Sequence, residues 1–189
     1  MESGKIIILT APSGSGKTTV AKFLLSKFPN ISFSISATTR VPRAGEINGV
    51  NYLFINLEEF QKKIKNEEFF EYQEVYPNQY YGTLHAEIQR IWKDQKIALF
   101  DIDVKGAYGL ERQKSENVLS IYIKASSIEV LRQRLIHRGT ETPESIEKRI
   151  LKATEELEYC KYFDYVITND KLDLALKLIE TIVLDFMAH

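Results

Sequence analysis

The amino-acid sequence predicts an α/β fold with a mostly parallel central sheet, and two observations support that prediction. First, short and continuously apolar runs alternate with helical patterns, which is typical of strands buried on both faces of a parallel sheet. These runs are residues 6–9, 97–100, 119–123 and 165–167. Second, a glycine-containing segment, residues 11–19, stands between the first run and a helix that starts near Thr18. A ligand is expected beyond the carboxyl ends of the strands, where that segment lies.

The segment reads Ala-Pro-Ser-Gly-Ser-Gly-Lys-Thr-Thr, which predicts a phosphate-binding loop. Gly14 and Gly16 let backbone N–H groups turn inward around an anion, and the helix start adds the positive end of its dipole. Lys17 would reach the β- and γ-phosphates of a nucleotide, and the Thr18 hydroxyl would ligate the magnesium ion that bridges them. The expected fold is therefore a three-layer P-loop fold. The expected polyphosphate-binding residues are Ala11, Pro12, Ser13, Gly14, Ser15, Gly16, Lys17, Thr18 and Thr19.

Ala11 departs from the pattern G-x-x-x-x-G-K-[ST], which has glycine at its first position. A methyl group is tolerated there only if the backbone keeps a negative φ. The alternative interpretation is a glycine-rich turn that happens to contain a lysine. The strand before the segment and the helix-forming residues 20–27 after it favour phosphate binding.

Composition favours small-molecule ligands over nucleic acid or membranes. The chain has 25 Lys and Arg against 26 Asp and Glu, a formal charge of -1, and therefore no global basic field. A single cysteine, Cys160, cannot form an intramolecular disulfide, and the three histidines lack metal-ligand spacing. The run at residues 6–9 is too short for a signal peptide or a membrane span, which predicts a cytoplasmic protein.

Two segments interrupt the alternation of strands and helices. Residues 33–83 show period-2 patterning at Phe33 and Ile35 and again around Tyr52 and Phe54, with turn residues between, and are expected to form a small antiparallel insertion. Asn56 is the expected N-cap of a helix within it. Residues 126–158 are strongly charged and contain Thr142-Pro143, a suitable start for a helix. They are expected to form a helical hairpin on the surface.

A longer pattern begins with Ser36-Ala37-Thr38-Thr39-Arg40-Val41-Pro42-Arg43-Ala44-Gly45-Glu46 and continues through Gly49 to Tyr52 and Phe54. Further stretches are Phe70-Glu71-Tyr72, Tyr80-Tyr81-Gly82-Thr83, Asp101-Ile102-Asp103, residues 134–139 and Ile167-Thr168-Asn169-Asp170. In this order they resemble the guanylate kinases. The resemblance covers nearly the whole chain.

The resemblance implies an enzyme that uses ATP and Mg²⁺ to phosphorylate GMP, and dGMP, to the diphosphates in purine nucleotide metabolism. It also implies three structural regions. These are a P-loop core (residues 1–33, 84–125 and 159–189), a small α+β GMP-binding insertion (residues 34–83) and a helical lid (residues 126–158). The oligomeric state stays open.

For GMP, the resemblance implies contacts of two kinds. The phosphate is held by Arg40, Arg43, Tyr52 and Tyr81. Two arginines three residues apart can grip a dianion from two directions with charge-assisted bonds. The base is held by Glu71, Ser36 and Thr83. A single carboxylate accepts from both N1–H and the exocyclic amine of guanine, a donor pair that adenine lacks, and a hydroxyl can donate to O6.

Asp101 and Asp103 end an apolar strand, where a metal-binding acid is expected in a nucleotide-binding fold. The resemblance assigns Asp101 to the magnesium and acceptor-phosphate side, and Asp103 to guanine. The alternative interpretation is that two acids simply mark the end of a strand.

Arg134, Arg138 and Arg149 are implied, together with Lys17, to stabilise the transferring phosphoryl group. Arg134 and Arg138 lie four apart and share a helix face, and Arg149 is expected to open the next helix. Taken alone, this charged stretch would be interpreted as solvated helix surface. Asn169 matches a family position near the adenine of ATP, although a polar residue after a strand is also an ordinary turn former.

Two other functions are compatible with the fold. One is a non-enzymatic guanylate-kinase-like module that binds phosphorylated protein segments, which measurable ATP binding through Lys17 would disfavour. The other is a kinase for a different phosphorylated acceptor, which would need another set of base contacts.

Overall fold

The computed structural model describes residues 4–112, 116–137, 139 and 142–189. Contacts within the chain divide it into two compact units. The first unit is Met1–Lys5 with Asn30–Ala98, and the second unit is Ile6–Pro29 with Leu99–His189. Each unit contains some of the predicted site residues.

A five-stranded sheet with the order β2-β7-β1-β8-β9 confirms the predicted fold class. Its strands are β1 (Ile6–Thr10), β2 (Ile31–Phe33), β7 (Ile97–Asp101), β8 (Val118–Lys124) and β9 (Tyr165–Thr168). β8 is parallel to β1 and to β9. β1 is buried along its whole length, which explains why its sequence is apolar rather than alternating. β2 belongs to the first unit, and β7 passes from the first unit into the second.

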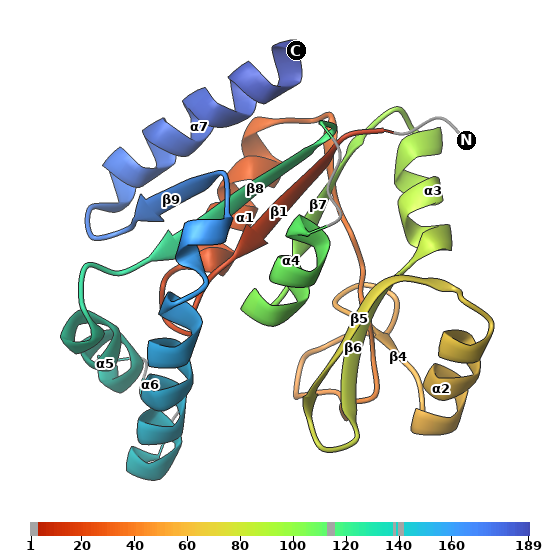
Figure 1. Ribbon diagram of the computed structural model, residues 1–189, viewed down its shortest axis with the longest axis horizontal. Coiled ribbons are helices and arrows are strands. Elements are labelled where there is room, and N and C mark those ends of the chain that lie inside the picture. Colours follow the sequence, from red (N-terminus) through yellow and green to blue (C-terminus); the bar gives the residue numbers. More distant parts are fainter. Residues whose placement is uncertain (1–3, 113–115, 138, 140–141) are drawn as a thin grey trace. The chain divides into compact units, whose positions relative to one another are not determined.

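The helices of the second unit include the predicted helical hairpin. They are α1 (Lys17–Lys27), α4 (Val104–Glu111), α5 (Ile128–His137), α6 (Pro143–Leu157) and α7 (Leu172–Ala188), with a short 3-10 helix η1 (Cys160–Tyr162). α5 and α6 lie side by side around a core that includes Leu131 and Ile150 (Figure 1). The Thr142 hydroxyl caps α6 as predicted. The prediction that Arg149 opens this helix is wrong, because the Thr142-Pro143 pair sets the start and Arg149 lies further along.

The first unit contains a four-stranded sheet with the order β4-β3-β6-β5. Its elements are β3 (Ala37–Thr38), β4 (Leu53–Phe54), α2 (Leu57–Lys65), β5 (Phe69–Tyr76), β6 (Gln79–Leu84) and α3 (His85–Lys93). β6 is antiparallel to β3 and β5, but β3 and β4 are parallel. The predicted purely antiparallel insertion is therefore wrong for this pair. The reason is that the intervening residues form a looped excursion rather than a hairpin, with left-handed turns at Gly45 and Gly49.

A small aromatic core holds the first unit together. Phe60 of α2 is fully buried and stacks on Phe69 of β5, with 4.3 Å between ring centroids. The Asn56 side chain caps α2 as predicted, accepting a hydrogen bond from the Glu59 N–H. Gly82 in β6 has no room for a side chain, because a Cβ there would lie 2.7 Å from the Glu71 carbonyl oxygen. This glycine therefore brings β5 and β6 close together beside Glu71.

Among the described residues, no helix is both long enough and apolar enough to cross a lipid bilayer.

Candidate functional site

The phosphate loop of the second unit has the backbone that the sequence predicts. Gly14 and Gly16 adopt φ values of 90° and 97°, which residues with side chains rarely adopt. α1 begins directly after Gly16, so its unpaired N–H groups face the loop. Ala11 is buried and is absent from the described non-glycine residues with positive φ, so its methyl group is tolerated.

Lys17, the first residue of α1, is held by the end of β7 and the chain that follows. Its Nζ lies 2.6 Å from Asp101 Oδ1 and donates to the Ile102 carbonyl at 2.8 Å. The Thr10 hydroxyl donates to the same carbonyl at 3.1 Å. Both charged side chains are about one-fifth exposed, so the ammonium group is oriented yet open to a ligand. Thr18 and Thr19 are exposed at the same helix start.

Asp101 and Asp103 have different surroundings. Asp101 pairs with Lys17, whereas Asp103 is the N-cap of α4 and accepts a hydrogen bond from the Gly106 N–H at 2.8 Å. An acid at this position stabilises the helix start, both as a cap and through the helix dipole. Asp103 therefore has a structural role that the sequence interpretation did not include.

Two of the three predicted lid arginines contact the phosphate-binding region. Arg149 of α6 donates from Nη1 to the Ser13 hydroxyl at 2.7 Å. Arg134 of α5 donates from Nη2 to the Asn169 carbonyl at 2.6 Å and lies 3.9 Å from Asp170. The structure thus brings Arg134 and Arg149 to the same region of the second unit as Lys17. The third predicted arginine, Arg138, lies outside the described residues.

A buried carboxylate, Glu156, lies on α6 close to this region. The residue is only 4% exposed, and burial raises the pKa of its carboxyl group above the ordinary value of 4.5. Lys152, 3.5 Å away on the same helix, and Lys17 partly oppose that rise, whereas Asp103 adds to it. The Tyr122 hydroxyl donates to the Glu156 backbone carbonyl, fixing this turn of α6 against β8.

Replacement of Glu156 by Gln is expected to change how stability depends on pH. Because the folded state holds the Glu156 proton more tightly than the unfolded state, wild-type stability falls as pH rises from about 4.5 through the raised folded pKa. The variant lacks this loss and should be more stable than wild type at pH 7.5, with the difference closing below pH 4.5. Urea unfolding at several pH values measures the difference in free energy of unfolding between variant and wild type, and exposed Glu155→Gln is the control. A difference that does not change with pH would contradict the raised pKa of Glu156.

In the first unit, Arg40 lies in a cluster of polar and aromatic groups. Its two terminal nitrogens donate to the two Glu46 oxygens at 2.9 and 2.8 Å, and its Nε donates to the Tyr81 hydroxyl at 3.1 Å. The paired Arg40 guanidinium lowers the pKa of the Glu46 carboxyl. The guanidinium carbon also lies 5.3 Å from the centroid of the Tyr52 ring. Three of the four predicted phosphate ligands are thus gathered at one place.

The fourth, Arg43, is exposed, and its backbone N–H donates to Glu46 at 2.7 Å. Glu46 therefore bridges the side chain of one predicted phosphate ligand and the backbone of the other. Glu46 is part of the sequence motif but was not predicted as a site residue. A carboxylate six residues after an arginine within a turn-rich segment is the signal that could have identified it.

Two of the three predicted base-binding residues, Glu71 and Thr83, meet on the β5–β6 pair. Glu71 and Thr83 are direct partners across the two strands, and the Thr83 hydroxyl donates to Glu71 Oε1 at 2.7 Å. Thr83 is fully buried, and Ser36, just before β3, is 8% exposed. Thr83 therefore fixes the orientation of the carboxylate while leaving Glu71 partly exposed.

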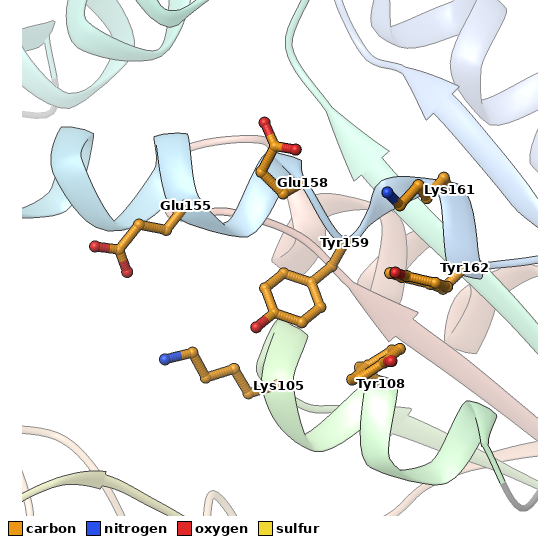
Figure 2. A pocket seen from close by; sticks show the side chains of 7 residues that line it. All are labelled: Lys105, Tyr108, Glu155, Glu158, Tyr159, Lys161 and Tyr162. Atoms are coloured by element: carbon orange, nitrogen blue, oxygen red, sulfur yellow. The ribbon is translucent and has the colours of Figure 1, made fainter.

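A separate hollow of about 530 Å³ lies at the base of α6 in the second unit, and it contains none of the predicted site residues. It is lined by Lys105, Tyr108, Glu155, Glu158, Tyr159, Lys161 and Tyr162 (Figure 2). The Tyr108 ring of α4 lies 4.7 Å from the Tyr162 ring and 5.2 Å from the Tyr159 ring, measured between centroids. This aromatic cluster packs α4 against the chain that follows α6.

Few side chains of this structure are placed to bind a metal ion. Among the described residues, no group of three or more His, Cys, Asp or Glu side chains is placed to hold one. Thr18 and Asp101 supply a hydroxyl and a carboxylate oxygen, the hard donors that Mg²⁺ prefers. Mg²⁺ commonly uses one or two carboxylates together with substrate phosphates. The donor set therefore fits a magnesium ion that is bound jointly with a nucleotide.

Several known proteins are similar to this chain over most of its length. The family model described as "Guanylate kinase" matches residues 3–185. A guanylate kinase from Bacteroides fragilis is 47% identical over 171 residues, 90% of this chain and 84% of its own length. One from Porphyromonas gingivalis is 45% identical over 97% of this chain and 98% of its own. The crystal structure of guanylate kinase from Anaplasma phagocytophilum superposes with a TM-score of 0.77 at 31% identity, covering 98% of this chain and 87% of that one.

Proposed function

Because the chain belongs to the guanylate kinase family and phosphorylates GMP to GDP with ATP, we propose that it does so with Mg²⁺ and that it also accepts dGMP. A cytoplasmic location is part of the proposal, since both nucleotides are found there. The observation that carries the mechanism is the convergence of Lys17, Arg149 and Arg134 on the phosphate-loop region of the second unit.

ATP binding is assigned to residues 11–19. Inward N–H groups at the glycines and the start of α1 surround the phosphates, and Lys17 exchanges Asp101 for them. Arg134 and Arg149 then stabilise the charge that spreads over the equatorial oxygens during transfer, which is the main catalytic requirement of this reaction. A magnesium ion held by Thr18 and Asp101 would neutralise part of the phosphate charge.

GMP binding is assigned to the first unit together with Asp101 and Asp103. Arg40, Arg43, Tyr52 and Tyr81 would hold the phosphate, and Arg40 must release some of its contacts to Glu46, because four of its five N–H groups are already used.

Glu71 would accept the two adjacent donors of guanine, and Ser36 and Thr83 would bind near O6. The Thr83–Glu71 hydrogen bond supports this, since it presents the carboxylate in one orientation. The base contacts also separate this proposal from a kinase of another acceptor, because a pyrimidine or adenine would leave the Glu71 carboxylate without its donor pair.

Residues 34–83 and 126–158 are proposed to act as mobile regions around a core of residues 1–33, 84–125 and 159–189. Closure would exclude water, which could otherwise accept the phosphoryl group.

Closure has its own expected result. Small-angle X-ray scattering should show a smaller radius of gyration when GMP and a non-hydrolysable ATP analogue are both present than with neither. Each nucleotide alone serves as the control, and a profile unchanged by the pair would count against closure.

The function is tested by ADP release from ATP and Mg²⁺ with GMP, dGMP, AMP, CMP and UMP in separate reactions. Turnover confined to the two guanine nucleotides is the expected result. Turnover with another acceptor would favour a kinase of different specificity. Binding of GMP without any turnover would favour a non-catalytic binding module.

A further inference from the structure

Asn169 lies between β9 and α7 and makes three polar contacts within the second unit. Its backbone N–H donates to the Lys124 carbonyl at 2.7 Å, which anchors it at the end of β8. Its side-chain Nδ2 donates to the Ser15 carbonyl of the phosphate loop at 2.8 Å. Its own carbonyl accepts from Arg134 Nη2 at 2.6 Å. The residue is 5% exposed, so these are contacts of a buried group.

The contact to Ser15 determines the orientation of a phosphate-loop peptide. In a trans peptide, the carbonyl oxygen of one residue and the N–H of the next point in opposite directions. The structure has no cis peptide among the described residues. When the Ser15 carbonyl points to Asn169, the Gly16 N–H must therefore point the other way, away from Asn169. The Asn169 amide thus fixes the direction of one of the N–H groups that the loop offers to an anion.

The fit between Asn169 and the loop leaves no spare space. A Cβ built on Gly16 would lie only 2.3 Å from Asn169 Nδ2. Gly16 is therefore required for this approach as well as for its φ of 97°.

We propose that Asn169 is a positioning residue that couples the phosphate loop to Arg134, with its amide orienting the Ser15–Gly16 peptide and its carbonyl orienting the guanidinium. The inference rests on the proposed function for the identity of the ligand, ATP. It differs from the adenine contact that the family resemblance implies, because the amide nitrogen is directed at the loop. The orientation of the Ser15–Gly16 peptide affects phosphate binding, and the orientation of Arg134 affects phosphoryl transfer.

Two substitutions distinguish this role from simple packing. Asn169→Ala removes the donor and leaves the Ser15 carbonyl without its partner. Asn169→Asp keeps the shape but places a carboxylate oxygen against that carbonyl. When this carboxyl group is protonated, it can donate in place of the amide. Arg134 and Asp170 are the charged groups beside it. The pKa of Asp170 is lowered by Ser126, so neither changes charge as pH falls from 8 to 5.

The experiment measures binding of a non-hydrolysable ATP analogue by calorimetry from pH 5 to 8, and the KM values for ATP and GMP. Each variant should bind the analogue about tenfold more weakly than wild type at pH 8, the cost of one buried carbonyl left unpaired. The KM for GMP should stay within twofold of wild type. For Asn169→Asp the loss of affinity for the analogue, relative to wild type, should become smaller as pH falls. For Asn169→Ala this loss should not change with pH. Exposed Asn30→Asp is the matched control.

Wild-type affinity for the analogue in both variants would overturn the proposal, as would equal losses for ATP and GMP. An Asn169→Asp deficit that persists at low pH would overturn the amide's role. If Asn169→Ala does not fold, Asn169→Ser replaces it, since a serine hydroxyl is too short to reach the Ser15 carbonyl. Analogue binding needs no turnover, so this result is separate from the proposed function, which fails only if wild type does not phosphorylate GMP.

Discussion

Lys17→Ala is expected to lower turnover about a thousandfold while leaving GMP affinity unchanged. The loss is of the size seen when one preorganised electrostatic donor is removed from a transition state. Lys17 is such a donor, because the Asp101 carboxylate at 2.6 Å and the Ile102 carbonyl at 2.8 Å hold its Nζ beside the phosphate loop. The proposed arginine and tyrosine ligands of the GMP phosphate lie in the first unit, so GMP affinity should be largely kept although Asp101 loses its Lys17 partner.

The measurement is steady-state ADP release together with calorimetric titration of GMP. Lys22→Ala is the matched control, since Lys22 is exposed on the same helix and should retain wild-type turnover. A variant that keeps a tenth of wild-type turnover would contradict the role of Lys17. A parallel loss of GMP affinity would show that the substitution disturbs more than the phosphate loop.

Glu71→Gln is expected to raise the KM for GMP about a hundredfold with little effect on the KM for ATP. The carboxylate accepts two hydrogen bonds from guanine, whereas the amide offers one acceptor and one donor, so a donor faces a donor. Loss of a charge-assisted bond and one unpaired donor together account for that factor. Thr83 still has an oxygen to donate to in the variant, so β5 and β6 should stay paired.

Glu58→Gln, an exposed change on α2, is the matched control for the loss of one negative charge. Steady-state kinetics in which the concentrations of GMP and ATP are each varied give the two KM values separately. Equal effects on GMP and ATP would rule out the base-contact assignment. A gain of activity with AMP in the variant would support it further, because adenine N1 is an acceptor where guanine N1–H is a donor, and the Gln amide can donate to that acceptor.

The parts of the fold predicted correctly from the sequence are those in which local chemistry is sufficient. β1 is recognisable because a strand buried on both faces must be apolar throughout. Asn56 and Thr142 are recognisable as caps because the unpaired N–H groups of a helix start need a nearby acceptor. Gly14 and Gly16 are recognisable because positive φ strongly favours glycine.

The errors arose where distant segments determine the geometry. The parallel pairing of β3 with β4 depends on how the looped excursion between them returns, and turn residues alone do not fix that direction. The position of Arg149 along α6 was misjudged, yet its side chain reaches Ser13, 136 residues away in sequence. Burial of Glu156 likewise depends on the elements packed around α6.

By itself, the sequence determined the fold class and the phosphate loop, because these follow from short-range patterns of polarity and glycine. The residues expected to bind GMP came from the resemblance to the guanylate kinases. Only the tertiary structure decided how those groups are engaged. It pairs Lys17 with Asp101, Arg40 with Glu46, and Asn169 with the Ser15 carbonyl. The fold decides which groups lie beside each other. A buried polar group then forms its hydrogen bond with the partner that the fold places next to it.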